Sequence, residues 1–296
     1  MKTTAKKSGP LLDVLQESLG IDSKTRIRKM LKYGMIRLDG APADRPDLQI
    51  RAGQTIEYLK KTGIKKSVKP PLPLLYEDDH ILVTEKPAGI LTYGEKGSGG
   101  TSLYRELRDF VKKRSEGRQR LCVVHRLDRE VSGLILFAKH GKAQEALKAG
   151  WSDTKKRYLA LVEGVPASNE GTIQTWLKEG VDRRVYSVDK PKGAKLAVTH
   201  YRIVKKLPAH TLLEIRTDTG RKNQIRVHLS EMGCAIVGDR RYGADDSVIR
   251  RIRLHASYLG FTHPFTGYFH EFESPLPKGF LSLKDRDENY KHGMLG

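Results

Sequence analysis

Two short apolar runs near the middle of the chain enclose a compact group of polar residues. Residues 121–124 and 134–137 are apolar, and each run has the length of a buried strand. Between them lies Asp128, with Arg126 and Arg129 close to it along the chain. Neighbouring cations favour the charged form of a carboxylate, and partial burial opposes it. The residues alone leave two interpretations open, an ion-paired turn and a site of tuned chemistry.

The apolar spacing before residue 60 predicts a small αβ module. Two segments place apolar residues on one face of a helix, residues 11–19 and 24–33. Two others read as short strands, residues 35–38 and 55–59. We therefore assign residues 10–60 to one module. Residues 1–9 are rich in Lys, Thr and Ser, and we expect them to form a disordered basic tail.

The rest of the chain reads as a linker followed by a larger domain. Residues 61–73 combine a run of charges with a Pro pair, as a linker does. We assign residues 74–285 to the larger domain and residues 286–296 to a polar tail. The strands predicted in this domain cover residues 80–84, 121–124, 134–137, 154–164, 171–177, 184–188, 197–203 and 212–215.

The charge of the chain says more about its partner than the length does. Lys and Arg outnumber Asp and Glu by 55 to 35 in the 296 residues, which gives a net charge of +20. Such a surface favours a polyanionic partner, with nucleic acid as the first candidate and an anionic membrane surface as the second. No window approaches the ~18 apolar residues that a membrane span needs. We therefore expect no membrane-spanning segment.

The cysteines and histidines indicate neither a disulfide framework nor a metal site. Cys122 and Cys234 form no CxxC pair and lie in apolar surroundings, as reduced thiols of a cytosolic protein do. None of the histidines occurs in an HExxH or a Cys/His zinc spacing. The N-terminus has no signal-peptide pattern. We therefore expect a cytoplasmic protein that holds no metal.

Three motifs follow one another in the larger domain. They are HRLDREVSG at residues 125–133, TGRKNQIRVH at 219–228 and GDRRYG at 238–243. Together they resemble the signature of the RluA-type pseudouridine synthases. The resemblance implies an enzyme that breaks the N1–C1′ bond of a uridine in RNA, turns the uracil and rejoins it through C5. Because the product is an isomer of the substrate, it also implies that no cofactor is needed.

The same resemblance implies roles for individual residues. Asp128 corresponds to the essential catalytic aspartate, and Arg226 to the arginine that pairs with it. Tyr158 corresponds to the tyrosine that packs on the target base, although a core tyrosine is the alternative interpretation. Arg126 corresponds to the residue that helps displace that base from its helix. Attack of Asp128 on C1′ and removal of the 2′ proton both remain open, and the base that removes the C5 proton is not identified.

The chain departs from the family pattern at Asn223, where histidine is usual. Asparagine donates and accepts hydrogen bonds but does not titrate. Positioning by this side chain therefore remains possible, whereas a proton-transfer role does not. This departure is the best support for an alternative to the enzyme, a non-catalytic RNA-binding assembly factor with the same fold.

The N-terminal module resembles the S4 RNA-binding module, because a basic helix, a glycine, a strand and an Asp-Gly turn follow in the same order. The cations of its predicted helix are the expected RNA contacts. With two arginines of the larger domain, the predicted RNA-binding residues are Lys24, Arg26, Arg28, Lys29, Lys32, Arg126 and Arg221. A basic helix face that is merely solvated is the alternative interpretation.

Pattern and resemblance together predict an α+β protein. We expect a large, mostly antiparallel mixed β-sheet with flanking helices, plus the small N-terminal S4-like αβ module. The motif around Asp128 should lie in a basic cleft of the larger domain. The expected partner is structured RNA, with ribosomal RNA favoured by the S4-like module and transfer RNA as the alternative. We expect the protein to act as a monomer.

Overall fold

The computed structural model describes residues 2–20, 23–32, 36–43, 45–58, 69–94, 102–189, 192–245 and 251–282. The chain divides into two units, Met1–Lys69 and Pro70–Gly296, and each is described by itself. Residues 61–68 of the predicted linker and the predicted polar tail at 286–296 lie outside the described residues.

In its described residues, the first unit contains two helices and two small sheets. Its helices are α1 (Leu11–Leu19) and α2 (Lys24–Lys32). Its four-stranded sheet has the order β1 (Lys2–Thr4), β6 (Thr55–Tyr58), β3 (Ile36–Leu38) and β4 (Ala41–Pro42), and β2 (Gly9–Pro10) pairs with β5 (Gln49–Ile50). The helices bury one face each, so that Leu15 and Ile27 join Ile56 of the sheet in a common core.

The expectation of a disordered tail over residues 1–9 is wrong. Strand β1 pairs antiparallel with β6, with Lys2 opposite Glu57 and Thr4 opposite Thr55. Ala5 is 3% exposed and belongs to the core of the unit. The segment lacks an apolar run, but its backbone hydrogen bonds are supplied by a strand more than fifty positions later, and a tertiary partner of this kind leaves no local pattern.

In the part of the second unit that the structure describes, one sheet of eleven strands organises the fold. Its main order is β13-β12-β14-β15-β11-β16-β10-β8-β7, with β17 added on β16 and β9 on β10. The strands are β7 (Leu74–Glu77), β8 (Ile81–Lys86), β9 (Cys122–Val123), β10 (Ser132–Ala138), β11 (Lys155–Glu163), β12 (Glu170–Glu179), β13 (Val185–Val188), β14 (Lys195–Lys206), β15 (His210–Thr217), β16 (Leu254–Thr262) and β17 (Phe269–Glu273).

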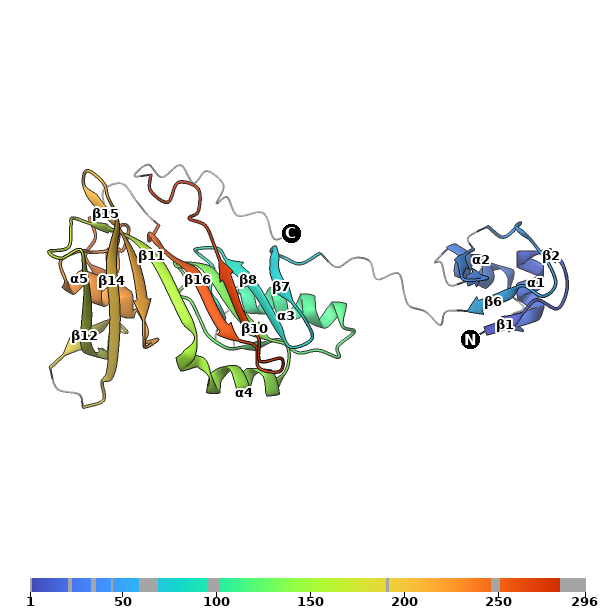
Figure 1. Cartoon of the computed structure of the whole chain (residues 1–296), viewed down its shortest axis with the longest axis horizontal. Coiled ribbons are helices and arrows are strands. Elements are labelled where there is room, and N and C mark those ends of the chain that lie inside the picture. Colours follow the sequence, from blue (N-terminus) through green and yellow to red (C-terminus); the bar gives the residue numbers. More distant parts are fainter. Residues whose placement is uncertain are drawn as a thin grey trace. The chain divides into compact units, whose positions relative to one another are not determined.

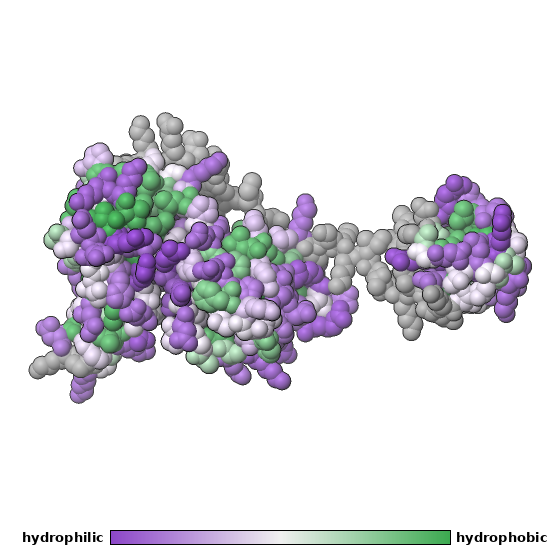
Figure 2. All heavy atoms as spheres, in the orientation of Figure 1, coloured by the Kyte–Doolittle hydropathy of each residue, from purple (hydrophilic) through white to green (hydrophobic). Residues whose placement is uncertain are grey.

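Helices flank this sheet. They are α3 (Leu103–Arg114), α4 (Gly141–Ala149) and α5 (Gln224–Glu231), with the one-turn helices η1 (Trp151–Asp153) and η2 (Arg240–Tyr242). Figure 1 shows α5 beside β14 and α3 toward the opposite end of the sheet, near β7. Figure 2 shows hydrophilic side chains interspersed with smaller apolar areas on the face in view. Among the described residues, no helix combines the length and apolar character needed to span a membrane.

The predicted α+β architecture with a mostly antiparallel mixed sheet is confirmed. Among the strand pairs of the described residues, β10 and β16 run parallel and the others antiparallel. The alternation around Tyr158 becomes β11, in which Ala160 and Val162 face a core shared with α5. Strand β17 was not predicted, because its alternating side chains are partly exposed and it adds to β16 late in the chain.

The parallel pair requires a glycine. Gly133 of β10 lies opposite Ala256 of β16 and has a φ of +117°. A Cβ atom at this position would lie 2.2 Å from the carbonyl oxygen of Ala256. Glycine therefore permits the close approach of β10 and β16. Because β10 directly follows the polar segment around Asp128, this approach supports that segment.

Candidate active site

The loop that carries Asp128 joins β9 to β10 and is tied to the segment after β8. The hydroxyl of Thr92 donates to the carbonyl of Leu127 at 2.7 Å and accepts the Leu127 N–H at 3.1 Å. The N–H of Gly89 donates to the carbonyl of Arg129 at 2.7 Å, and the Arg129 Nε donates back to the carbonyl of Gly89 at 2.9 Å. The residues on both sides of Asp128 are thus held by hydrogen bonds that involve their main-chain atoms.

A buried lysine completes this attachment. Lys86, at the end of β8, is 1% exposed. Its Nζ donates to the carbonyls of Pro87 and Ile90, both at 2.9 Å, and of Arg129 at 3.1 Å. Burial lowers the pKa of Lys86 to about 7, and the charges of Glu130 and Asp128 oppose that shift. Lys86 therefore holds the loop through carbonyl oxygens in a poorly solvated position.

A left-handed turn begins α5 and directs Arg226 toward the loop. Asn223 has a φ of 54°, a conformation in which asparagine is enriched. The Gln224 side chain accepts hydrogen bonds from the Thr219 hydroxyl at 2.8 Å and from the Arg221 N–H at 3.0 Å. These contacts fix the first turn of the helix, and the Arg226 side chain is buried at 7% exposure.

Arg226 contacts two carboxylates at the site in different ways. It donates from Nε and Nη2 to the two oxygens of Asp239, at 2.7 and 2.8 Å. Its Nη1 lies 3.5 Å from Asp128 Oδ2 and 3.8 Å from Glu130 Oε2. Burial opposes the charge, but the hydrogen bond and charge of Asp239 outweigh it and raise the pKa of Arg226. Arg226 is therefore beside Asp128 as expected, while its bidentate partner is Asp239.

Asp239 was not among the predicted site residues. It lies in the GDRRYG motif and is 1% exposed. A buried Asp needs a compensating cation. In the sequence, the pair was indicated only by the presence of an Asp in one motif and an Arg in another. The pairing itself depends on the tertiary approach of η2 to α5, which the sequence does not reveal.

Tyr158 and Asp128 line one cavity of about 170 Å³. Its wall also includes Arg126, Arg221 and Arg226. Tyr158 comes from β11, where it pairs with Ile215 on one side and Ala256 on the other. Burial raises the pKa of Tyr158 to about 12, and the charge of Asp128 adds to the shift. The cavity thus presents a neutral phenol, a carboxylate and guanidinium groups to one small space.

The predicted RNA-binding residues fall in different parts of the chain. Arg126 and Arg221 are exposed, and Arg221 Nε donates to the carbonyl of Leu196 at 2.9 Å. Lys24 and Arg28 are exposed on α2 of the first unit. The side chains of the other three predicted contacts lie outside the described part of the chain, namely Arg26, Lys29 and Lys32.

Histidines near the site have structural contacts. His125 accepts the Leu136 N–H at Nε2 at 3.0 Å and stacks on Trp151 with ring centroids 4.6 Å apart. Burial lowers the pKa of His125 to about 3, and Lys156 adds to the shift. Within the described ranges, no three His, Cys, Asp or Glu side chains converge on a position that could hold a metal ion.

Comparisons with known proteins identify the family of the chain. Residues 80–231 match the family described as RNA pseudouridylate synthase. The ribosomal large subunit pseudouridine synthase D of Xanthomonas campestris is 35% identical over 289 residues, covering 91% of this chain and 86% of that protein. The protein of the same name from Pseudomonas aeruginosa is 34% identical over 280 residues, covering 88% of this chain and 86% of that protein.

A solved structure gives the same fold. Human RNA pseudouridylate synthase domain containing 4 superposes with a TM-score of 0.59 at 24% identity, covering 70% of this chain and 89% of that one. The family match spans the segments that carry Asp128 and Tyr158. The chain belongs to the RNA pseudouridylate synthase family, and this membership confirms the RluA-type resemblance of its motifs.

Proposed function

We propose that this protein is an RNA pseudouridine synthase that isomerises uridine in structured RNA, with large-subunit ribosomal RNA as the favoured substrate. One observation carries the proposal: Asp128 and Tyr158 line the same cavity, with Arg226 Nη1 3.5 Å from the Asp128 carboxylate. The relatives named ribosomal large subunit pseudouridine synthase D support the choice of RNA. Transfer RNA is the alternative substrate.

The reaction needs one carboxylate to promote release of the uracil from its sugar. Asp128 can attack C1′, which breaks the N1–C1′ bond and leaves a sugar ester, or it can take the 2′ proton and leave a glycal. In either route uracil turns in the cavity and C5 rejoins C1′. The C5 proton then leaves, and N1, released from the sugar, takes up a proton. In the glycal route the 2′ proton also returns to C2′, so that the product is an isomer of the substrate in either case.

The surrounding residues position the reactants. Arg226 orients the Asp128 carboxylate through a charge-assisted contact. Tyr158 packs on one face of the uracil, and such stacking is worth about 1–3 kcal/mol per base. Arg126, exposed at the mouth of the cavity, supports the extruded nucleotide; extrusion costs a few kcal/mol that RNA contacts must offset. Asn223 serves as a structural group that holds Tyr242 and Arg226.

We assign the reaction to residues 74–285 and RNA capture to residues 10–60, joined by the linker at 61–73. The helix–helix–strand order of the first unit, with Lys24 and Arg28 exposed on α2, supports an S4-like RNA-binding role. This role predicts that removal of positive charge from α2 weakens RNA affinity without changing the chemistry at Asp128.

The variant Asp128→Asn tests the assignment, because it preserves shape and removes the nucleophile and base. RNA labelled with tritium at uridine C5 releases tritium when pseudouridine forms. We expect wild-type protein to release tritium from 23S-type ribosomal RNA, and the variant to bind that RNA without releasing any. Full turnover by the variant would refute the role of Asp128. Absence of release by the wild type from ribosomal and transfer RNA would refute the enzyme and favour the RNA-binding assembly factor.

A further inference from the structure

A second hollow lies next to the Tyr158 cavity, on the side of Asp128 that faces η2. Its volume is about 360 Å³. The two hollows share Arg126, Asp128, Lys222, Asn223 and Arg226 in their walls. Tyr158 does not line the second hollow. The residues that line only this hollow come from the loop after Asp128 and from residues 238–241, together with Leu91 and Ile252. Its wall therefore lacks the tyrosine that would pack on a base.

The charge of this hollow is strongly positive. Its cationic wall residues are Arg126, Arg129, Lys222, Arg226, Arg240 and Arg241. Its anionic wall residues are Asp128, Glu130 and Asp239. Asp239 is fully engaged by Arg226, so that its charge is matched within the wall. The excess positive charge at the surface of the hollow favours an anionic ligand.

The turn that presents Arg240 and Arg241 is held rigidly from beneath. Tyr242, 3% exposed, accepts hydrogen bonds at its hydroxyl from Asn223 Nδ2 at 3.0 Å and from the Val185 N–H at 3.1 Å. Its carbonyl accepts from the Ser230 hydroxyl at 2.5 Å. Arg240 and Arg241 themselves are exposed. Arg240 and Arg241 therefore line the hollow from a fixed support, and Arg241 Nη2 also donates to the carbonyl of Asp182 at 3.2 Å.

The position of the hollow limits what its ligand can be. A uridine whose base lies in the Tyr158 cavity has its C1′ atom at Asp128, and its backbone must continue from that point. We propose that the hollow binds the phosphodiester next to the target uridine, so that the base and its neighbouring phosphate occupy adjoining sites. This inference rests on the proposed function and adds the place where the RNA strand leaves the active site.

Phosphate binding here has a mechanical consequence. Arginine recognises phosphate with a planar pair of donors, and such contacts fix the register of a nucleic acid without reading its sequence. A phosphate held by Arg240 and Arg241 would keep C1′ at Asp128 while the uracil turns. The anchoring point is then the backbone, because the base loses its own attachment to the sugar during the reaction.

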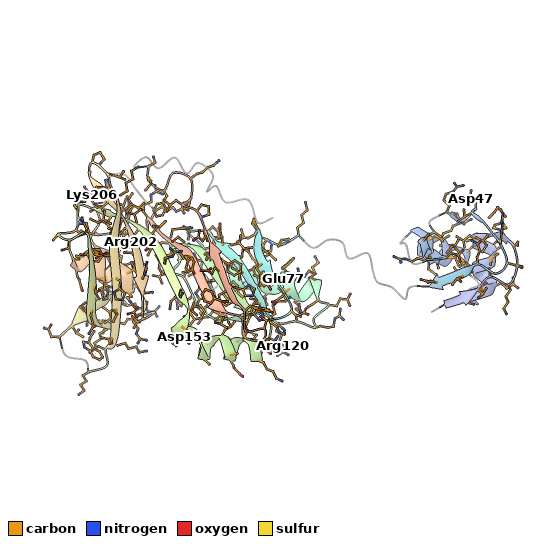
Figure 3. The ribbon with its side chains drawn as sticks, in the orientation of Figure 1. Asp47, Glu77, Arg120, Asp153, Arg202 and Lys206 are labelled. Atoms are coloured by element: carbon orange, nitrogen blue, oxygen red, sulfur yellow. The ribbon has the colours of Figure 1, made fainter. Side chains whose placement is uncertain are left out.

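The test compares two paired variants with equal loss of charge. Arg240→Gln/Arg241→Gln removes two positive charges from the hollow. Arg202→Gln/Arg216→Gln is the matched control, because both arginines bind Glu214. Arg202, labelled in Figure 3, alternates on β14 with Tyr201 and Ile203, which pack on the Tyr158 side of the sheet. Arg202 therefore projects from the opposite face.

Two measurements decide the outcome. In the first, RNA affinity is measured between 50 and 300 mM KCl for a minimal single-stranded or hairpin substrate. Each lost phosphate contact reduces the magnitude of the negative slope of log K against log salt by about 0.7–0.9. We expect the hollow variant to reduce this magnitude by about 1 to 2 and the control pair to change it by less than about 0.5. Equal changes in the two pairs would overturn the proposal.

In the second, a neutral methylphosphonate replaces one phosphate, either 5′ or 3′ of the target uridine. The wild type should lose at least about fivefold in affinity for one of the two RNAs, and the hollow variant should show no further loss for that RNA. A loss of the same size in both proteins would show that the phosphate is bound elsewhere. Both measurements report binding, so they remain informative even if tritium release fails; that failure would refute the proposed function instead.

Discussion

Arg226 donates two hydrogen bonds to Asp239 and approaches Asp128 with Nη1. The first contact is at 2.7 and 2.8 Å and the second at 3.5 Å. The guanidinium carbon also lies 5.1 Å from the ring centroid of Tyr242. Asp239 and Tyr242 thus hold Arg226 from the side away from the cavity. Asp128 consequently lies beside the charge of Arg226, whose bidentate hydrogen bonds go to Asp239.

The variant Asp239→Asn should reduce the rate more than it reduces RNA binding. With the charge of Asp239 removed, Arg226 is free to turn toward Asp128 and form the bidentate pair that arginine favours. We expect the single-turnover rate to fall at least about tenfold, with RNA affinity changed less than threefold. Removing one partner of a buried ion pair also costs stability, up to about 3–5 kcal/mol, so rates are measured where chemical unfolding shows the variant to be folded.

Asp218→Asn is the matched control for Asp239→Asn. Asp218 pairs with His200 on the exposed face of the sheet, at 2.9 Å. The control should keep the wild-type rate. If Asp239→Asn also keeps that rate, Arg226 does not depend on Asp239 for its orientation. If affinity and rate fall by the same factor, Asp239 acts through RNA binding instead.

Two variants of Tyr158 distinguish a stacking role of this side chain from a proton-transfer role. Its pKa is raised to about 12, so the phenol is neutral across the range in which the enzyme can be assayed. Tyr158→Phe keeps the ring and should retain the rate within about fivefold. Tyr158→Ala removes the ring, and loss of about 1–3 kcal/mol of stacking predicts a 5- to 150-fold lower kcat/KM. The rate of tritium release at pH 7 to 9 is the measurement.

Inactivity of Tyr158→Phe would contradict the stacking role. It would identify the hydroxyl as a participant in the chemistry, with removal of the C5 proton as the step to examine. Tyr201→Phe is the control, because Tyr201 packs against the same apolar cluster without lining the Tyr158 cavity. That control should behave as the wild type.

Particular residues show what the sequence could predict and what it could not. The alternation around Tyr158 predicted β11, because a strand with one buried face leaves a period of two in the chain. The short strand β1 left no such pattern, because its order comes from pairing with β6. Lys86 left no signal either: lysine is rarely buried, and only the fold brings the carbonyl of Arg129 to its Nζ.

The residues of the candidate site also fall into those that the sequence predicts and those that it does not. Asp128 and Arg226 were found through motifs, and these motifs are adjacent in space because the loop after β9 and the helix α5 share one apolar cluster. Asp239 belongs to a motif as well, but its partner could not be read from residue types. An ion pair between distant segments is a property of packing, and local sequence carries no measure of it.

Gly133→Ala should destabilise the second unit strongly. The new methyl group would meet the carbonyl of Ala256 at 2.2 Å, and alanine is strained at a φ of +117°. Overpacking and backbone strain each cost about 1–3 kcal/mol, so we expect the free energy of unfolding to fall by about 3 kcal/mol or more. Urea denaturation followed by tryptophan fluorescence measures it.

Gly141→Ala is the matched control for Gly133→Ala. Gly141 is the first residue of α4, and a Cβ atom there would meet nothing within 4 Å. Alanine should be neutral or slightly stabilising at this position, because it favours helix more than glycine does. Equal destabilisation by the two substitutions would mean that the approach of β10 to β16 does not explain the effect at Gly133.

Lys86 should make stability depend on pH in a defined window. Its pKa is about 7 in the folded protein and 10.5 ordinarily, so the unfolded chain binds more protons between these values. Stability rises with pH wherever the unfolded state binds more protons. The contribution of Lys86 is therefore least favourable below pH 7 and improves as pH rises toward 10.5. The neutral amine has two hydrogens for the carbonyls of Pro87, Ile90 and Arg129, whereas the ammonium can donate to all three.

Comparison of the wild type with Lys86→Met isolates this contribution. The variant lacks the titrating group, so the unfolding free energy of the wild type minus that of the variant should increase between pH 7 and 10. The increase is at most about 1.4 kcal/mol per pH unit for one proton. Lys178→Met, which removes an exposed lysine of β12, is the control for loss of a lysine. A difference that stays constant from pH 7 to 10 would mean that Lys86 keeps its proton in the folded protein, and that the loop around Asp128 is held by a charged ammonium rather than an amine.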